Sequence, residues 1–356
     1  MESELERNQS QRKGRVLTNK YGLPEPLLRA VIGLDGNYKK RGHISVTTLM
    51  DSPKVNILRS NFEYHEDISD MLWALRGTAV HLVLDHSAQE LNKFDDSNGI
   101  PRRYTPEFKM EMEFKVNDED PNEEPIVVTG SYDLTYNLEP KTLFDYKDTS
   151  VWKVKDCVKD IDVDTGQVIY TAKGKACLDW QKQTNCYAYM LRNKYGVVIR
   201  KIRIIVLLKD WKKQDAMTDA NYPEKPIAIV DIPIRSDVAV LNFIKERIKL
   251  HKEAYKLYRE QGIDAVPECN EDERWKKKDV WKMMSTATAA RSSKNFEING
   301  LVDEVNAQAF FDGTFKPKNP GAYINKVKGF NGRCMDYCPT NVHCHFYKAL
   351  VQNKAR

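Results

Sequence analysis

The sequence has no long hydrophobic run. Its longest aliphatic stretch, Ile204-Ile205-Val206-Leu207-Leu208, has the length of one buried strand and falls well short of the roughly 20 apolar residues that a membrane-spanning helix requires. The first residues, MESELERNQSQRKGR, contain no apolar segment of the kind that directs secretion. We therefore expect a cytoplasmic protein with no membrane partner.

The chain also lacks a large excess of charge of one sign. Lys and Arg number 56 against 51 Asp and Glu, which gives a net charge of +5 at pH 7. This small excess permits a polyanionic partner without requiring one, because the distribution of charge matters more than its sum. A charged fraction of 30% beside a hydrophobic fraction of 41% is typical of a soluble protein with a real core.

No internal repeat is evident, and no export signal accompanies the seven cysteines. Cysteines in such a context favour metal ligation or free thiols over disulfides. Shifts in composition divide the chain into a flexible basic arm over 1–20, a core over 21–265 and a Cys-rich subdomain over 266–356. We expect the second boundary, near 265, to separate two folding units.

Hydrophobic periodicity predicts an α/β (α+β) fold in which helices flank a central mixed sheet. The predicted helices cover 68–91, 178–193 and 236–261, and the last ends at Gly262. Strands are predicted over 107–116 and 197–208, with a hairpin over 129–150 and a smaller hairpin within 154–172.

The larger hairpin, TGSYDLTYNLEPKTLFDYKDTS, carries an unusual set of charges. Asp145 and Lys147 point to the same face of one strand, about 6–7 Å apart, and Asp133 lies in the neighbouring strand. An ordinary interpretation is a solvated face with a weak surface ion pair. Two close carboxylates, however, remain ionised readily when a cation lies between them, and oxygen ligands of this kind suit Mg²⁺ or Mn²⁺. With a lysine beside it, such a metal predicts a site for phosphodiester hydrolysis.

Two helical segments add candidates. In LRGTAVHLVLD, Gly77, His81 and Asp85 share a helix face, and the glycine is expected to let another element approach closely. A lone helical histidine is more often structural, but the downstream carboxylates favour a ligand role for His81. In WQKQTNCYAYML, Gln183 and Tyr187 lie four residues apart, and the pattern alone favours a core tyrosine with an exposed neighbour.

Four motifs occur in order along the chain: G-T-x-x-H at 77–81, G-x-x-D at 130–133, D-x-K at 145–147 and Q-x-x-x-Y at 183–187. This set resembles the RecB-like branch of the PD-(D/E)XK nuclease superfamily, which includes phage-type and CRISPR-associated exonucleases. The flanking stretches ISVTTLMDSPKVNIL and DTSVWK are also similar. Asp145 stands where many relatives carry Glu, and the segment Lys153–Lys175 is longer than the usual connection.

The resemblance implies a restriction-endonuclease-like core and a specific set of site residues. It implies that the metal, Mg²⁺ or Mn²⁺, is held by His81, Asp133, Asp145 and the backbone carbonyl of Tyr146. It implies that Lys147 is the catalytic lysine. Gln183 and Tyr187 would position the scissile strand or buttress that lysine.

The function implied is that of a metal-dependent DNA nuclease, an exonuclease of phage or prophage DNA replication, recombination or end processing. Its partners would be DNA and a recombination or replication protein, in the cytoplasm of a bacterial cell or phage-infected host. Two alternatives stay open: a catalytically silent nucleic-acid-binding protein with a metal-stapled tail, and a site-specific endonuclease.

The tail GRCMDYCPTNVHCHFYK contains three closely spaced cysteines, Cys334, Cys338 and Cys344. With a fourth thiolate they can hold Zn²⁺ or a [4Fe-4S] cluster, and His343 or His345 can replace a thiolate at a zinc site. Many RecB-like nucleases take the fourth ligand of an iron–sulfur cluster from near the N-terminus, where this chain has no cysteine. Phage relatives take it from the position of Cys269, and Cys157 competes for that role.

The stretch WKKKDVWKMM interleaves two tryptophans, Trp275 and Trp281, with lysines. Trp275, Lys276, Lys277 and Lys278 are candidates for stacking on bases and neutralising phosphates. The alternative, equally favoured, is that the tryptophans pack a small domain and the lysines are solvated. Further basic candidates are Arg12, Lys13, Arg15, Lys39, Lys40 and Arg41.

Overall fold

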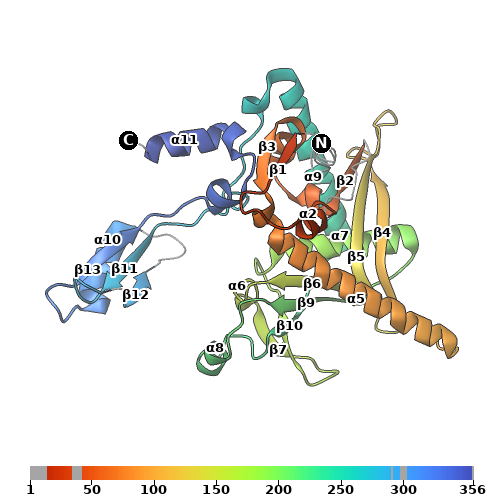
Figure 1. Cartoon of the computed structure of the whole chain (residues 1–356), viewed down its shortest axis with the longest axis horizontal. Coiled ribbons are helices and arrows are strands. Elements are labelled where there is room, and N and C mark those ends of the chain that lie inside the picture. Colours follow the sequence, from red (N-terminus) through yellow and green to blue (C-terminus); the bar gives the residue numbers. More distant parts are fainter. Residues whose placement is uncertain (1–13, 34–41, 290–291, 297–302, 355–356) are drawn as a thin grey trace. The chain divides into compact units, whose positions relative to one another are not determined.

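A mixed sheet of eight strands organises the first part of the chain in the computed structural model, which describes residues 14–33, 42–289, 292–296 and 303–354 (Figure 1). In chain order its strands are β2 (His43–Ser45), β4 (Tyr104–Phe114), β5 (Ile126–Tyr136), β6 (Thr142–Thr149), β7 (Val158–Ile161), β8 (Val168–Thr171), β9 (Lys201–Leu208) and β10 (Ile227–Asp231). The strand order is β2-β5-β6-β9-β10-β8-β7, and β4 pairs with β5. The pairs β2/β5, β6/β9 and β8/β10 are parallel and the others antiparallel. The fold is therefore mixed α/β.

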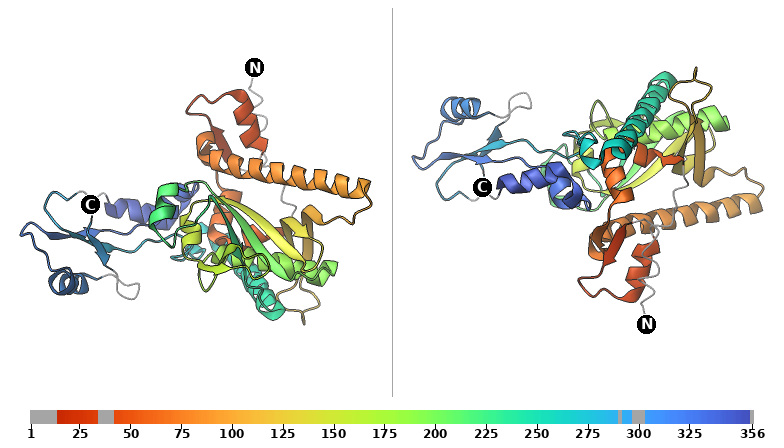
Figure 2. Two further views of the ribbon diagram at one scale, coloured as in Figure 1. Left: turned by 90° about the horizontal axis from the view of Figure 1, so that it is seen from below. Right: turned by 90° about the horizontal axis from the view of Figure 1, so that it is seen from above.

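Helices cover both faces of this sheet. Those of the first unit are α2 (Glu25–Gly33), α3 (Val46–Met50), α4 (Pro53–Asn61), α5 (Leu72–Ser97), α6 (Trp152–Lys155), α7 (Leu178–Tyr195), α8 (Lys213–Thr218) and α9 (Asp237–Gln261). Figure 2 shows α5 on one side of the sheet and α7 and α9 on the other. None of the helices within the described ranges is both long enough and apolar enough to cross a bilayer.

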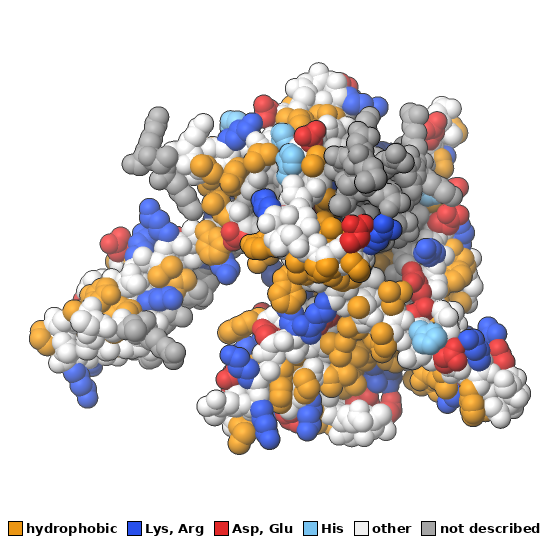
Figure 3. All heavy atoms as spheres, viewed as in Figure 1, with side chains coloured by type: hydrophobic (Ala, Val, Ile, Leu, Met, Phe, Trp, Pro, Cys, Tyr) orange, Lys and Arg blue, Asp and Glu red, His pale blue; other side chains and the backbone are white. Residues whose placement is uncertain are grey.

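The main core lies between the sheet and the layer of α7 and α9. Its buried side chains include Val128, Leu143, Ile204, Met190 and Ile244. The opposite face of the sheet is covered by α5. The fully buried residues of this helix are Asn92 and Asp95, which are both polar. Trp73, Leu82, Val83 and Phe94 of α5 are exposed, and Figure 3 shows hydrophobic side chains at the surface over this helix. The face beneath α5 is thus not a conventional apolar core.

The N-terminal region differs from the expected arm. Arg15–Thr18 forms a strand, β1, that pairs in parallel with β3 (Tyr64–Asp67), so the prediction of a flexible arm is wrong for these residues. Arg15 is buried and its Nε lies 2.7 Å from Glu66 Oε2, which removes it from the candidate DNA contacts. The rest of that basic set, Arg12, Lys13, Lys39, Lys40 and Arg41, lies outside the described residues.

The predicted helices and hairpins are present. The helix predicted over 236–261 is α9, where the Ser236 side chain accepts a hydrogen bond from Ala239 N and Gly262 ends the helix. The helix predicted over 68–91 begins as a 3₁₀ turn, Ile68–Met71, and continues as α5 to Ser97. The smaller hairpin is β7/β8, which extends the sheet at β10.

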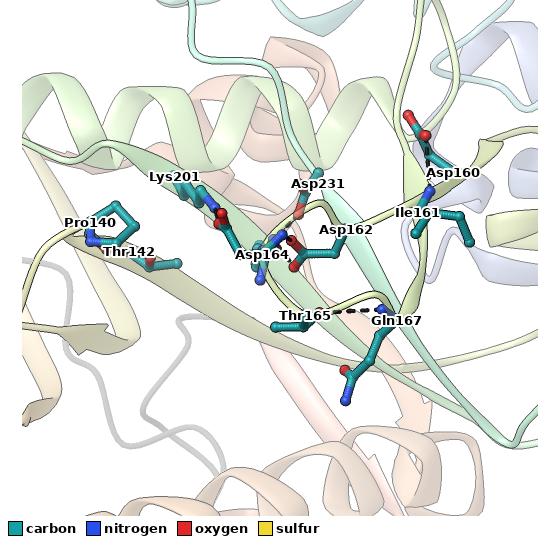
Figure 4. A network of polar contacts seen from close by, with 11 residues as sticks. Pro140, Thr142, Asp160, Ile161, Asp162, Asp164, Thr165, Gln167, Lys201 and Asp231 are labelled. Atoms are coloured by element: carbon teal, nitrogen blue, oxygen red, sulfur yellow. Dashed lines mark hydrogen bonds and ion pairs between the residues drawn. The ribbon is translucent and has the colours of Figure 1, made fainter.

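Ionic contacts fix this smaller hairpin to the sheet (Figure 4). Arg203 of β9 donates to Asp162 Oδ2 at 2.6 Å and to Asp231 Oδ1 at 2.8 Å. Lys201 forms an ion pair with Asp164 at the hairpin turn. The long connection over Lys153–Lys175 is therefore an ordered extension of the sheet rather than a loose loop.

The chain divides into two compact units, of which the first runs to Gly262 and the second begins at Ile263. The second unit contains β11 (Val280–Met284), β12 (Lys294–Phe296), β13 (Tyr323–Val327), α10 (Glu304–Phe310), α11 (His345–Lys354) and the short helical turns Ile263–Ala265, Phe311–Phe315, Arg333–Tyr337 and Asn341–His343. Its small core consists of Trp281, Met283, Ala307 and Phe311. Of the two tryptophans in the basic stretch, Trp281 is therefore a core residue.

Candidate functional site

The candidate site lies where β5 and β6 stop pairing. The antiparallel pairing between them is limited to Leu134–Tyr136 of β5 and Thr142–Phe144 of β6. Beyond that point the start of β5 pairs with β2, while β6 continues alongside β9. Asp133 and Asp145 are the first residues past the paired segment on their strands, so the two carboxylates flank a fork in the sheet.

Asp133 is held by contacts from two elements. Its Oδ2 accepts a hydrogen bond from the backbone N–H of Tyr146 at 2.7 Å, which ties it to β6. Its Oδ1 lies 3.2 Å from Nδ1 of His81, which α5 supplies. The hydrogen bond to Asp133 raises the pKa of His81 above its usual value, although partial burial opposes this. The protonated form of the His81 side chain is therefore stabilised at this site.

Asp145 is the most enclosed member of the site, with 3% of its side chain exposed. Burial raises the pKa of the Asp145 carboxyl to about 6, although the positive charge of Lys147 acts to lower it. Lys147 Nζ lies 2.6 Å from Asp145 Oδ2, so the lysine ammonium is the cation that this buried carboxylate oxygen contacts. A buried oxygen without a hydrogen bond is costly unless a cation satisfies it.

A second ionic contact joins α5 to the strand that carries the site. Arg76 Nε lies 2.9 Å from Oδ2 of Asp148, which is almost fully buried. The sequence interpretation missed both residues, although Arg76 directly precedes Gly77 and Asp148 directly follows Lys147. Leu72 and Leu75 of α5 pack, half-buried, against a small core of Leu28, Val31 and Ile68, and this ion pair and the His81–Asp133 contact join the helix to the strands at the fork.

The Q-x-x-x-Y pair packs against β5. Gln183 Nε2 donates to the Tyr187 hydroxyl at 2.9 Å, and the buried Tyr187 ring packs on Gly130. A Cβ at position 130 would meet this ring, which explains a glycine three residues before Asp133. The expectation for Gly77 is wrong, because no atom lies within 4 Å of the position its Cβ would take.

The structure thus brings His81, Asp133, Asp145 and Lys147 together at one fork, with Tyr146 between the last two. In their present arrangement no three His, Cys, Asp or Glu side chains of the described ranges could hold a metal ion. The carboxylates are engaged instead by His81 Nδ1, Tyr146 N and Lys147 Nζ. The two carboxylates and the backbone carbonyl of Tyr146 are nevertheless donor types that suit Mg²⁺ or Mn²⁺.

The four cysteines of the tail gather in the second unit. Backbone contacts pair the segment after Cys269 with the segment before Cys334: Gly332 N donates to Trp275 O and Arg333 N donates to Arg274 O. Burial raises the pKa of the Cys334 thiol to about 11, and the negative charges of Cys269, Cys338 and Cys344 add to this effect. All four are half-buried and belong to the second unit, although, as at the fork, no three of these described side chains are placed to hold a metal ion in the present arrangement.

The basic stretch is only partly free for a ligand. Trp275 is 51% exposed, and its ring centroid lies 5.2 Å from that of Tyr337. Lys276 forms an ion pair with Glu271, and Lys277 Nζ lies 5.1 Å from the centroid of the Phe330 ring. Lys278 also has an interaction within the chain. The role of these residues in binding nucleic acid stays a prediction.

Comparison with known proteins gives no assignment. No family model matches the chain, and no curated protein matches it. Among solved structures, a chain described as the crystal structure of SSO0001 is 14% identical in sequence, with a match that covers 63% of this chain and 84% of that chain at a TM-score of 0.37. A likeness at this TM-score carries no argument about fold family or function.

Proposed function

We propose that this chain is a metal-dependent DNA nuclease of the RecB-like type with a restriction-endonuclease-like core, acting as an exonuclease in DNA replication, recombination or end processing. The observation that carries the proposal is the convergence of His81, Asp133, Asp145 and Lys147 at the fork between β5 and β6. These residues are separated by up to 66 positions and belong to three of the four motifs, G-T-x-x-H, G-x-x-D and D-x-K.

In this proposal His81, Asp133, Asp145 and the carbonyl of Tyr146 would hold Mg²⁺ or Mn²⁺. The bound cation would supply Lewis-acid stabilisation of the charge that develops on a non-bridging phosphate oxygen. Lys147 would orient the attacking water and add its own positive charge near the phosphate. Tyr187 and Gln183 would keep β5, and with it Asp133, in position. Each role is filled by a residue type that is competent for it.

The tail is proposed to bind a [4Fe-4S] cluster through Cys269, Cys334, Cys338 and Cys344, with Zn²⁺ as the alternative. Four thiols grouped in one small unit support this, because thiolates close together repel one another unless a cation lies among them. The cluster would be structural, joining the two segments that carry its ligands. Trp275, Lys276, Lys277 and Lys278 would contribute to DNA binding.

The test is DNA cleavage by the full chain with Mg²⁺ or Mn²⁺, on linear single-stranded, linear double-stranded and covalently closed circular DNA. Asp133→Asn and Lys147→Ala are expected to abolish cleavage while their thermal unfolding stays cooperative. Lys159→Ala is a matched control, because Lys159 also lies on a strand and forms a 2.6 Å ion pair, with Glu224. It should cleave like the wild type.

Each outcome has a defined meaning. Equal cleavage by the wild type and both site variants would remove the proposal, since the activity would then come from elsewhere. DNA binding by the wild type without cleavage under any metal would indicate a silent binding protein. Cutting of the closed circle would indicate an endonuclease, because an exonuclease needs an end.

A further inference from the structure

Two thiols of the first unit lie next to each other and outside the candidate site. Cys157 Sγ is 3.5 Å from Cys177 Sγ, and both cysteines are free. Cys157 directly precedes β7, and Cys177 directly precedes α7. The two cysteines are 20 positions apart in sequence, and the residues between them form the β7/β8 hairpin. Neither thiol belongs to the tail, and the nuclease proposal uses neither.

The surroundings make the two sulfurs chemically different. Cys177 is buried, has a left-handed backbone conformation with φ of 48°, and donates its S–H to the carbonyl of Lys153 at 3.0 Å. Cys157 is only half-buried, so a small solute can reach it. The Cys177 S–H can turn from the Lys153 carbonyl to Cys157 Sγ, and in that arrangement its hydrogen bond lowers the pKa of Cys157, with the nearby Lys153 acting in the same direction. Cys157 is thus the more reactive thiol and Cys177 the enclosed neighbour.

We propose that Cys157 and Cys177 form a redox-active dithiol that a small peroxide converts into a disulfide. The Cys157 thiolate attacks one oxygen of hydrogen peroxide and the O–O bond breaks. The hydroxide released takes up the proton that Cys157 lost and leaves as water, so that Cys157 becomes a sulfenic acid. The Cys177 sulfur then attacks the Cys157 sulfur, the S–O bond breaks, and the second hydroxide leaves with the Cys177 proton as water. Two thiols are oxidised by two electrons and one peroxide is reduced to two waters.

The seven cysteines differ in how well they suit this chemistry. Cys186 is fully buried, and burial raises the pKa of its thiol to about 12, which disfavours the reactive thiolate. The four tail cysteines belong to the other unit and are assigned to a different role here. Cys157 and Cys177 combine an accessible sulfur with a second sulfur already at contact distance. The resulting bond would connect the start of β7 to the N-terminus of α7.

The test uses the full chain, reduced, freed of reductant and treated with a few equivalents of hydrogen peroxide. Remaining thiols are alkylated in denaturant, and the protein is digested with trypsin, which cuts at Lys159 and Lys173 between the two cysteines. Mass spectrometry is expected to find the two peptides joined, and dithiothreitol should separate them. Both peptides alkylated and unlinked, or Cys157 joined to a tail cysteine, would overturn the proposal.

Variants separate the two steps. In Cys177→Ser the sulfenic acid on Cys157 has no thiol to resolve it, so labelling of Cys157 by dimedone should rise several-fold over the wild type. Cys157→Ser should abolish both dimedone labelling in this region and the linked peptides. Cys186→Ser is the control and should form the Cys157–Cys177 link to the wild-type extent. Equal dimedone labelling of Cys157 in the wild type and in Cys177→Ser would contradict the resolving role of Cys177.

Discussion

A Cβ atom on Gly130 would lie 2.7 Å from Cε1 and 3.0 Å from Cδ1 of Tyr187, so the tyrosine ring occupies the space of a side chain at position 130. The backbone conformation of Gly130 is not the reason for the glycine, because its φ is not positive. The reason is the close approach of α7 to β5. Two motifs far apart in the sequence, G-x-x-D and Q-x-x-x-Y, therefore describe the two sides of one packing contact.

Gly130→Ala should destabilise the protein by about 1–3 kcal/mol, because the added methyl overlaps a buried ring that cannot move freely. Gly77→Ala is the matched control: it lies inside α5 with nothing within 4 Å of the added methyl, so it should be neutral or stabilising by up to about 1 kcal/mol. Denaturant unfolding of both variants measures the difference. Equal effects at the two positions would contradict the packing explanation.

Asp145→Asn should stabilise the metal-free protein at neutral pH. Because the pKa of Asp145 is about 6 in the folded chain, above the ordinary 3.8, the folded state binds more protons between these values and its stability falls as pH rises through them. Asp145→Asn removes this loss, so the free energy of unfolding of the variant should exceed that of the wild type by an amount that grows from about pH 4 to pH 7, up to about 3 kcal/mol. Unfolding in chelator at several pH values measures it, and a stability difference that stays constant from pH 4 to pH 7 would contradict the prediction.

His251 should produce the opposite pH dependence. Its ring is buried on α9 with Nε2 3.1 Å from the Leu49 carbonyl, and burial lowers the pKa of His251 to about 4. The unfolded state therefore binds more protons between about pH 6.5 and 4, and stability is lost as pH falls through this window. The His251→Gln side chain can still donate a hydrogen bond to the Leu49 carbonyl. On acidification to pH 4 this variant should lose up to about 3 kcal/mol less of its free energy of unfolding than the wild type loses. Urea unfolding of both proteins at pH 7 and pH 4 measures this difference. Equal losses of stability in the wild type and the variant would rule out His251 as the cause.

The tail should bind a metal centre that depends on all four of its thiols. Protein purified without oxygen should be brown with visible absorbance, and Cys334→Ser or Cys344→Ser should lose both iron and colour. Cys186→Ser should retain them, since that thiol lies in the core of the first unit. A colourless wild-type protein with stoichiometric zinc would refute the iron–sulfur cluster and would indicate that the four cysteines form a zinc site.

Much of the first unit could be predicted because its signals are local. The helix α9 has a serine cap, a regular apolar stripe and a terminal glycine, and β9 is a run of β-branched residues. The pairs β1/β3 and β2/β5 were missed, because three- and four-residue strands are too short for alternation to be visible. The site residues were recognisable by resemblance, since D-x-K alone describes many solvated strands.

The sequence could not reveal how α5 is held. The apolar side chains of α5 are at most half-buried, and its ion pair between Arg76 and Asp148 joins residues 72 positions apart, which hydrophobic periodicity does not show. The role of Gly77 was misjudged for a related reason, because a glycine in a helix indicates close approach only if some element is there to approach. Contacts of this kind depend on pairing between distant elements, which no local pattern encodes.

The position of β6 between two strands has a further consequence. Its residues Asp145 and Lys147 align with Ile204 and Val206 of β9, and its start aligns with β5. If β6 slipped by one residue, Phe144 and Tyr146 would replace the aspartate and the lysine, and a charged pair would turn to the opposite side. Such a slip would remove the charged pair from the fork and disrupt the hydrophobic interior at once. A population of molecules should therefore contain either chains with the aligned charged pair or unfolded chains, with no folded but misaligned form between them.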